Sequence, residues 1–179
     1  MKGIVFTEFL ELVEEQFGIE TVQQIIDQCE LSTEGIYTAV GTYSHKDIFM
    51  MVQKLSELKE IPIPELLKVY GKYFFTVLSN GYPQFMKEKD LFSFLDSIDN
   101  YIHVEVLKLY PDAELPKFDS EIIDNKMTLL YQSTRKMSDF AIGLILGAAE
   151  YYNEPNIKIE VLKLEDEGQK AHIKIERFE

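Results

Sequence analysis

The chain has 179 residues, with 18 Lys and Arg against 31 Asp and Glu, which gives a formal net charge of −13. A hydrophobic fraction of 46% and an aromatic fraction of 12% supply enough apolar side chains for a core, which argues against a disordered chain. The acidic charge is spread along the sequence without a basic block, so it would repel the phosphates of nucleic acids and anionic membranes. The length suits a single domain.

The only cysteine is Cys29, so an internal disulfide, a zinc ribbon and a redox cysteine pair are all excluded. We expect Cys29 to be a buried or half-buried thiol in a helix. The N-terminus turns acidic at Glu8 before any apolar run that could form a signal peptide. No stretch of about eighteen apolar residues could cross a bilayer. We therefore expect a soluble, cytoplasmic protein.

The front part of the chain has the apolar period of helices. The pattern predicts helices over residues 4–17, 21–29, 44–60, 64–78 and 89–109. Gly18 is typical of a helix end, Ser44 of a helix cap, and Pro64 of a first helical turn. The helix after Pro64 is apolar on more than one face and should be deeply buried. We expect Pro111 to end the last of these helices.

The pattern changes to that of strands at about residue 122. It predicts strands over residues 122–123, 127–133, 157–161 and 171–176, with the last two forming a hairpin. Between them, residues 136–152 predict a helix in which Gly143 and Gly147 are spaced for close packing. The predicted fold class is α+β, with a helical N-terminal part and a C-terminal antiparallel sheet crossed by one helix.

The three histidines have different surroundings. We expect His45, beside a helix start, and His172, in an edge-like hairpin among charges, to lie at the surface. His103 lies inside the long predicted helix among apolar neighbours. A core histidine with its hydrogen bonds satisfied would give this pattern. The functional alternative is a single axial imidazole on a haem iron, which needs a neutral histidine and an apolar wall.

A second candidate feature is Tyr131-Gln132-Ser133-Thr134-Arg135. In an extended strand, Tyr131, Ser133 and Arg135 would share one face. Two hydroxyls and a guanidinium on one face form a good cradle for carboxylates, because arginine donates to both carboxylate oxygens and the hydroxyls complete the hydrogen bonds. An ordinary strand end with polar residues is the alternative interpretation.

Together these features resemble the H-NOX family, the haem-binding gas-sensor domain also found at the front of soluble guanylate cyclase. The resemblance covers nearly the whole chain. It includes the opening Met1-Lys2-Gly3, the segment from His103 to Pro111, the Tyr-x-Ser-x-Arg motif and Gly143-Leu144. It implies a single H-NOX domain over residues 1–179, with a helical distal subdomain (1–62) and a proximal part with the sheet (63–179).

The resemblance also implies the cofactor, haem b (iron protoporphyrin IX), and the residues that hold it. His103 would ligate the iron, and Tyr131, Ser133 and Arg135 would hold the haem propionates. Pro116 matches the proline that packs on the haem and bends the porphyrin. Ile4, Val5 and Leu144 would also contact the cofactor.

Oxygen-binding members of the family hold the gas with a distal tyrosine that donates a hydrogen bond. The position matching that tyrosine is Phe140, and the supporting polar positions match Phe9 and Phe74. Val5, Leu78 and Leu144 would complete an apolar pocket. Because phenylalanine has no donor, we expect nitric oxide and carbon monoxide to bind and oxygen to be excluded. The alternative is that Tyr37, Tyr43 or Tyr73 reaches the iron from another direction.

The resemblance implies that nitric oxide weakens the bond between iron and His103. The helix carrying His103 would then be released, and the porphyrin would flatten against Ile4, Val5 and Pro116. No kinase or cyclase segment follows before Glu179, so we expect the output to pass through a separate protein. The resemblance suggests a bacterial sensor histidine kinase or a cyclic-di-nucleotide enzyme, and the acidic surface would suit a partner with a basic patch.

Three alternatives to a nitric oxide sensor stay open at this point. An oxygen-binding haem sensor would need a distal donor. A haem enzyme, such as a peroxidase or a nitric oxide dioxygenase, would need distal groups that transfer protons. A haem-free helical module could use the same pocket for another apolar ligand.

Overall fold

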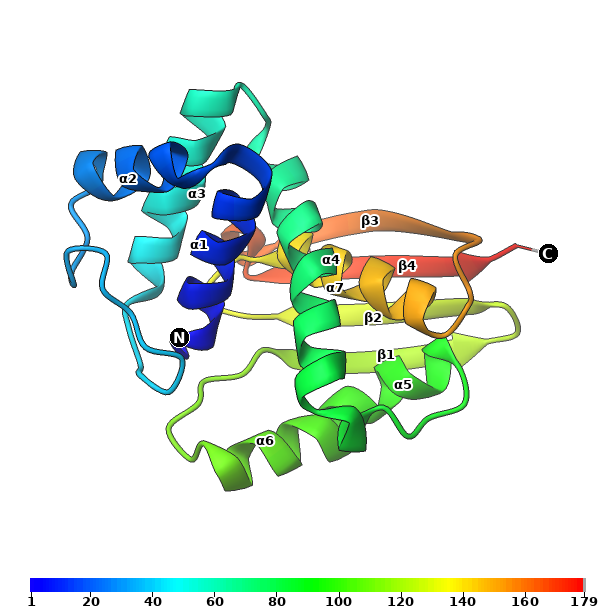
Figure 1. The fold of residues 1–179 in the computed structure, drawn as a ribbon. Coiled ribbons are helices and arrows are strands. Elements are labelled where there is room, and N and C mark those ends of the chain that lie inside the picture. The colour runs from blue at the N-terminus through cyan, green and yellow to red at the C-terminus, as the bar shows by residue number, and fades with distance from the viewer. Residues whose placement is uncertain (179) are drawn as a thin grey trace.

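The computed structural model describes residues 1–178 and has the predicted α+β fold (Figure 1). The helices are α1 (Ile4–Phe17), α2 (Ile19–Gln28), α3 (His45–Lys59), α4 (Ile63–Gly81), α5 (Leu91–Ser97), α6 (His103–Leu109) and α7 (Ser138–Tyr151). The strands are β1 (Lys117–Ile123), β2 (Lys126–Gln132), β3 (Ile157–Glu165) and β4 (Lys170–Arg177). Short 3-10 turns lie at Pro83–Phe85 and Asp166–Gly168, and a π-helical turn at Ile98–Ile102.

The predicted signals at the helix ends are confirmed. Gly18 has a φ of 85°, which lets the chain turn between α1 and α2. The Ser44 side chain accepts a hydrogen bond from the Lys46 backbone N–H, and Pro64 lies in the first turn of α4. Cys29 is half-buried, as expected, but the prediction that it lies in a helix is wrong, because it follows the last residue of α2 with an extended backbone.

The prediction of one long helix over residues 89–109 is wrong in one respect. The structure has three consecutive helical segments here, α5, the π-turn and α6. The His103 backbone N–H donates to the carbonyl of Ile98, five residues earlier, and this bond defines the π-turn. An apolar period does not reveal one extra residue in a turn, so the sequence alone favoured a regular helix.

The four strands form one antiparallel sheet in the order β1-β2-β4-β3. His172 therefore lies on a central strand, and the prediction of an edge position is wrong. β1 begins at Lys117, five residues before the predicted start. The prediction missed the first five of its seven residues because charged residues such as Asp119 and Glu121 occupy the solvent side of this edge strand.

The helix α7 packs between the sheet and α4, as Figure 1 shows. A Cβ atom added to Gly143 would lie 2.2 Å from the Lys68 carbonyl oxygen and 2.9 Å from the Gly71 Cα atom. Only a residue without a side chain allows the two helices to approach this closely, so the predicted close packing of Gly143 is confirmed.

Two clusters of buried side chains form the core. One lies among α1, α2, α3 and α4, and the other lies between the sheet and α5 and α7. Phe74 belongs to the first cluster and Phe75 to the second, so α4 is buried on more than one side, as predicted. Among residues 1–178, no helix has both the length and the apolar character needed to cross a membrane.

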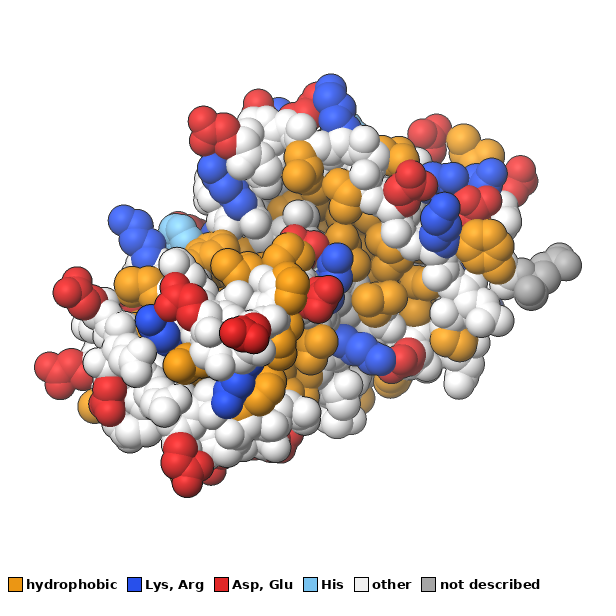
Figure 2. Space-filling model, turned by 90° about the horizontal axis from the view of Figure 1, so that it is seen from above, with side chains coloured by type: hydrophobic (Ala, Val, Ile, Leu, Met, Phe, Trp, Pro, Cys, Tyr) orange, Lys and Arg blue, Asp and Glu red, His pale blue; other side chains and the backbone are white. Residues whose placement is uncertain are grey.

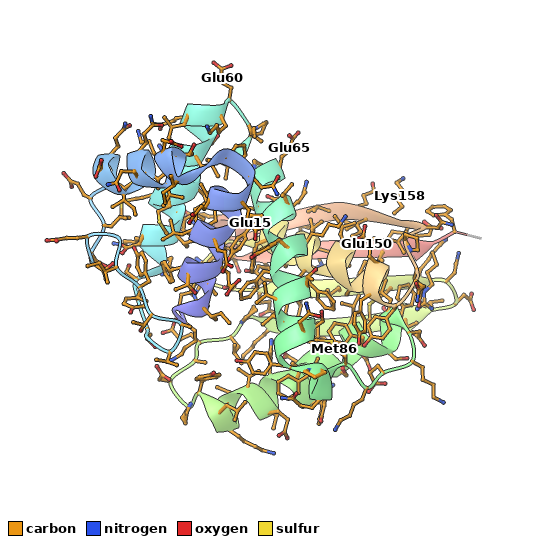
Figure 3. The ribbon with its side chains drawn as sticks, in the orientation of Figure 1. Glu15, Glu60, Glu65, Met86, Glu150 and Lys158 are labelled. Carbon is orange, nitrogen blue, oxygen red and sulfur yellow. The ribbon has the colours of Figure 1, made fainter. Side chains whose placement is uncertain are left out.

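The acidic charge is distributed over the outside. Figure 2 shows acidic side chains at many separate points of one face, among basic side chains and apolar areas. Glu60 and Glu65, at the end of α3 and the start of α4, point away from the molecule (Figure 3). Asp47 is an exception to this distribution, because its side chain is buried.

Candidate functional site

A cavity of about 360 Å³ opens between the two core clusters and is lined mostly by apolar side chains. Its wall comes from α1, α4, α5, α6, α7 and the strands β1 and β2, together with the turn after β2. Met86, which is labelled beside the lower part of α4 in Figure 3, also lines it. The size and lining are those of a small-molecule or cofactor site.

The structure brings almost all of the predicted site residues to this cavity. Those that line it are Ile4, Val5, Phe74, Leu78, His103, Pro116, Tyr131, Ser133, Arg135, Phe140 and Leu144. Phe9 does not line the cavity, because it lies behind Tyr70, with its ring edge-to-face at a centroid distance of 5.3 Å. His45 and His172 also lie outside the cavity wall, and both are half-buried.

His103 is the first residue of α6, and its side chain is 16% exposed. Its Nδ1 atom lies 2.8 Å from Oδ1 of Asp99. A carboxylate accepts hydrogen bonds, so Nδ1 carries the proton and Nε2 keeps a free lone pair. Burial lowers the pKa of His103, and the nearby Asp99 carboxylate opposes this shift only in part. The result is a neutral imidazole that is ready to ligate a metal.

Sequence reasoning missed Asp99. The signal was present, because an acidic residue four positions before a histidine lies on the same side of a helix. Metal-binding histidines commonly donate their other ring N–H to a carboxylate or carbonyl. The pair therefore supports His103 as a ligand rather than as a core histidine that lacks a function.

The segment that carries His103 has no core of its own. No residue of the π-turn or of α6 is buried. Several of its apolar side chains, including Ile98, Ile102 and Val106, line the cavity instead. A helix that directs its apolar side toward a cavity depends on the occupant of that cavity for its packing. The site therefore fits a large apolar cofactor.

Contrary to the prediction from the sequence, Tyr131, Ser133 and Arg135 do not share one face of a single strand. β2 ends at Gln132, and a turn follows in which the Lys136 N–H donates to the Ser133 carbonyl. The assumption of a continuous strand is therefore wrong, yet Tyr131 on β2 and both Ser133 and Arg135 on the turn still line the cavity. The Tyr131 hydroxyl accepts a hydrogen bond from the Met137 N–H at 3.2 Å, and burial raises its pKa.

The cationic groups at the rim of the cavity are paired with exposed carboxylates. Arg135, whose side chain is 11% exposed, lies 3.0 Å from Glu114, whose side chain is 82% exposed. Lys2 pairs with Asp112 at 3.4 Å, and Asp112 also accepts a hydrogen bond from the Thr42 hydroxyl at 2.7 Å. Because the Glu114 and Asp112 carboxylates are themselves exposed to solvent, a carboxylate ligand at the rim can replace them.

The wall formed by α4 and α7 is hydrocarbon. The rings of Phe74 and Phe140 lie 5.7 Å apart, and Leu78 and Leu144 complete this part of the lining. The nearest phenol behind the wall is that of Tyr70, whose ring is 5.1 Å from Phe140. Its hydroxyl donates to the Val5 carbonyl at 2.5 Å and is turned away from the cavity.

The other tyrosines considered from the sequence do not line the cavity. Tyr37 donates to the buried carboxylate of Asp47 at 3.0 Å, and burial raises its pKa to about 12. Tyr43 accepts from the Thr38 N–H, and Tyr73 donates to Glu8. Each of these hydroxyls is held by a partner outside the cavity.

The protein part of a metal site here is limited to one strong ligand. Within residues 1–178, no group of three or more His, Cys, Asp or Glu side chains is placed to hold a metal ion. An iron bound by His103 therefore needs its other ligands from a non-protein frame. A haem has this property, because the porphyrin supplies four nitrogens and the protein supplies an axial histidine.

Comparison with known proteins also indicates a haem-binding domain. Residues 2–161 match the family described as "Haem-NO-binding". The structure is similar to the Fe(II) unliganded H-NOX protein of K. algicida, at 42% identity and a TM-score of 0.95, over 100% of this chain and 97% of that one. It is also similar to the H-NOX protein of Shewanella woodyi in the Fe(II)CO state, at 44% identity and a TM-score of 0.84, over 99% and 95% of the two chains.

A more distant relative has the same fold. The H-NOX protein of S. oneidensis in the Fe(II)NO ligation state is 26% identical to this chain, with a TM-score of 0.91 over 100% of both chains. These proteins carry iron in the Fe(II) state, and two of them have carbon monoxide or nitric oxide as ligand. Their similarity extends over the whole described fold.

Proposed function

The chain belongs to the haem-NO-binding (H-NOX) family, and on this premise we propose that it is a haem-based sensor of nitric oxide that excludes oxygen. The observation that carries the proposal is the cavity itself, which has His103 on one side and phenylalanines on another. Haem b, when bound, supplies a ferrous iron that takes one protein ligand and one diatomic gas.

The residues of this chain have separate parts in binding the cofactor. His103 offers Nε2 to the iron, since Asp99 occupies Nδ1. Tyr131, Ser133 and Arg135 would bind the haem propionates at the rim, where a propionate would take the place of Glu114 beside Arg135. The remaining contacts are apolar and come from Ile4, Val5, Pro116 and Leu144.

Selectivity between gases follows from the chemistry of the distal wall. Oxygen bound to ferrous haem carries negative charge and needs a hydrogen-bond donor to persist. Phe74 and Phe140 have no donor, and the Tyr70 hydroxyl is committed to the Val5 carbonyl. Nitric oxide and carbon monoxide bind without such support, which accords with the ligands of the S. oneidensis and S. woodyi proteins.

The signal passes through the segment that carries His103. If His103 held the iron of a bound haem, its release would remove an attachment of α6, which has no buried residue to hold it in place. Such a segment has two arrangements, attached and detached, and gas binding changes their populations. We also propose that the domain divides into a helical distal subdomain (1–62) and a proximal part with the sheet (63–179), with the boundary at the start of α4. Residue 179 lies outside the described residues.

The receiver is a separate protein, for which we propose a sensor histidine kinase or a cyclic-di-nucleotide enzyme. The net charge of −13 and the dispersed acidic side chains visible in Figure 2 favour a partner with a basic surface. A regulatory role fits the distal wall better than catalysis, because peroxidases and dioxygenases need distal groups that transfer protons.

The test is the absorption spectrum of the purified, haem-supplemented protein. We expect a reduced Soret band that is unchanged by air and that shifts with nitric oxide to the spectrum of a haem without its histidine ligand. Absence of any Soret band would overturn the proposal and favour a haem-free module. A stable spectrum in air that differs from the reduced form would indicate an oxygen sensor, and rapid consumption of peroxide would indicate an enzyme.

A further inference from the structure

The carboxylate of Asp99 forms a hydrogen bond with the imidazole of His103. It lies in the π-turn directly before α6, and its Oδ1 atom is 2.8 Å from Nδ1 of His103. Within residues 1–178, His103 is its only hydrogen-bond partner. Asp96, which precedes Asp99 in the chain and lies in α5, accepts instead from the Ser120 hydroxyl at 2.5 Å. One of two neighbouring acidic side chains therefore acts on the imidazole and the other does not.

Asp99 reaches the imidazole without being buried itself. Its side chain is 31% exposed, whereas that of His103 is 16% exposed. Asp99 also lines a second, polar pocket of about 170 Å³, together with residues that include Asp96, Asn100 and Ser120. Asp99 thus lines this polar pocket and contacts His103, which lines the large cavity.

We propose that Asp99 is a positioning residue that holds His103 as the Nδ1–H tautomer and strengthens its bond to iron. This inference rests on the proposed function, because it concerns the haem ligand. A charged acceptor on Nδ1–H raises the electron density at Nε2, which makes the imidazole a stronger ligand, and it also fixes the orientation of the ring. Asp99 therefore opposes the release of α6 and determines how readily a gas triggers it.

The contact between Asp99 and His103 lies in the π-turn, at the start of the segment that we propose is released. The turn is a local irregularity directly before His103, and such turns recur at functional sites. Asp99 lies within the turn, and the bond between its side chain and His103 spans it. Loss of that bond would remove a side-chain restraint on a segment that has no buried residue.

The experiment compares Asp99→Asn with the matched control Asp96→Asn in the haem-loaded protein. We expect Asp99→Asn to lower the Fe–His stretching frequency in resonance Raman spectra of the reduced protein. It should also accelerate loss of the histidine ligand with nitric oxide by about tenfold. Asp96→Asn should match the wild type in both measurements. Asp99→Glu should give values between those of Asp99→Asn and the wild type. Equal effects of the two Asn variants, or none from either, would overturn the inference.

A second measurement needs no haem. In the haem-free protein with ¹⁵N-labelled histidine, the ring nitrogens of His103 should show one tautomer, protonated at Nδ1, in the wild type and in Asp96→Asn. Asp99→Asn should give a mixture of both tautomers. A mixture already present in the wild type would show that Asp99 does not hold the ring. Failure of the wild type to bind haem would overturn the proposed function, and the tautomer measurement would still test Asp99 alone.

Discussion

The hydroxyl of Tyr70 donates a hydrogen bond to the backbone carbonyl of Val5 at 2.5 Å, and this contact joins the middle of α4 to the first turn of α1. Tyr70 is 1% exposed, and Val5 lines the cavity. The contact therefore connects the wall of the site to the centre of the helical core. It also keeps the phenol away from the cavity.

Tyr70→Phe should destabilise the protein by about 1 kcal/mol, because it removes one buried hydrogen bond and leaves the aromatic packing in place. Denaturation in urea would measure the change. Tyr73→Phe is the matched control, since its hydroxyl only reaches Glu8 at 3.4 Å on a half-buried site, and it should change stability much less. Equal losses of stability in both variants would show that the hydrogen bond to Val5 stabilises the fold no more than the contact with Glu8 does.

Phe140→Tyr should give at least partial oxygen binding, because it adds a donor to a ring that lines the cavity. The measurement is the spectrum of the reduced protein in air, compared with the wild type. Phe140→Leu, which adds no donor, should remain insensitive to oxygen. If Phe140→Tyr also ignores air, then residue 140 does not face the bound gas.

His103→Gly should remove the protein ligand while leaving the apolar cavity, so that added imidazole can restore a haem spectrum. Nitric oxide should still bind to the variant but no longer change the output of the partner protein, because α6 is no longer attached. Partner activity with and without nitric oxide is the measurement. An unchanged response in this variant would contradict signalling through release of His103.

Gly143→Ala should destabilise the protein by about 1–3 kcal/mol or more, because the new methyl group would overlap the Lys68 carbonyl oxygen at 2.2 Å. Gly81→Ala is the control, since a Cβ atom there would meet nothing within 4 Å. Thermal unfolding of both variants would test the tight crossing of α4 and α7. Equal melting temperatures for the two would contradict it.

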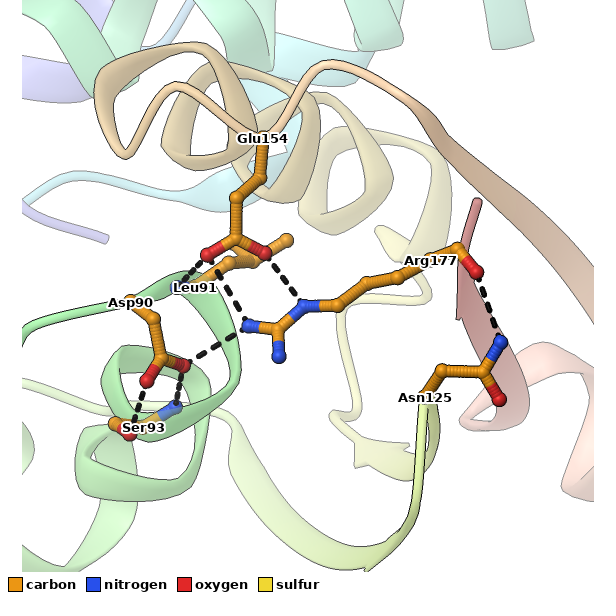
Figure 4. A network of polar contacts seen from close by, with 6 residues as sticks. All are labelled: Asp90, Leu91, Ser93, Asn125, Glu154 and Arg177. Carbon is orange, nitrogen blue, oxygen red and sulfur yellow. Dashed lines mark hydrogen bonds and ion pairs between the residues drawn. The ribbon is translucent and has the colours of Figure 1, made fainter. Parts of the chain in front are cut away.

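Asp90 begins the helical segment that leads to His103, and Figure 4 shows its surroundings. It accepts from the Ser93 N–H at 3.0 Å and from Arg177 at 2.9 Å, while Arg177 also pairs with Glu154 and lies 3.7 Å from the ring of Phe92. Asp90→Ala should cost about 1 kcal/mol through loss of the helix cap. Ser56→Ala on α3, which removes a hydrogen bond from the Ser56 hydroxyl to the Ile61 carbonyl, is the comparison variant for a loss of stability outside this network.

The same contacts predict an effect of pH. The hydrogen bond from the Ser93 N–H, followed by those from Arg177 and the Ser93 hydroxyl, lowers the pKa of Asp90 below its usual value of 3.8. A carboxyl with a lowered pKa stabilises the fold above its unfolded pKa, and this contribution is lost as the pH falls through the folded pKa. The wild type should therefore lose more stability than Asp90→Ala when the pH falls below about 4. Parallel acid unfolding curves would contradict this assignment.

The sequence by itself determined the α+β class, most helix bounds, the hairpin and the glycine packing of α7. It also predicted that His103 and the Tyr-x-Ser-x-Arg motif belong to one site, and all four of these residues line the cavity. These features depend on local periodicity, on caps and on short spacings, which operate within a few residues of the chain.

Only the tertiary structure decided how the site is built. It placed Phe9 behind Tyr70, brought Ser133 and Arg135 to the cavity through a turn instead of a strand, and joined Asp99 to His103 across a π-turn. It also placed β4 at the centre of the sheet. These outcomes depend on contacts between distant segments and on the exact register of one turn, and an apolar period contains no information about either.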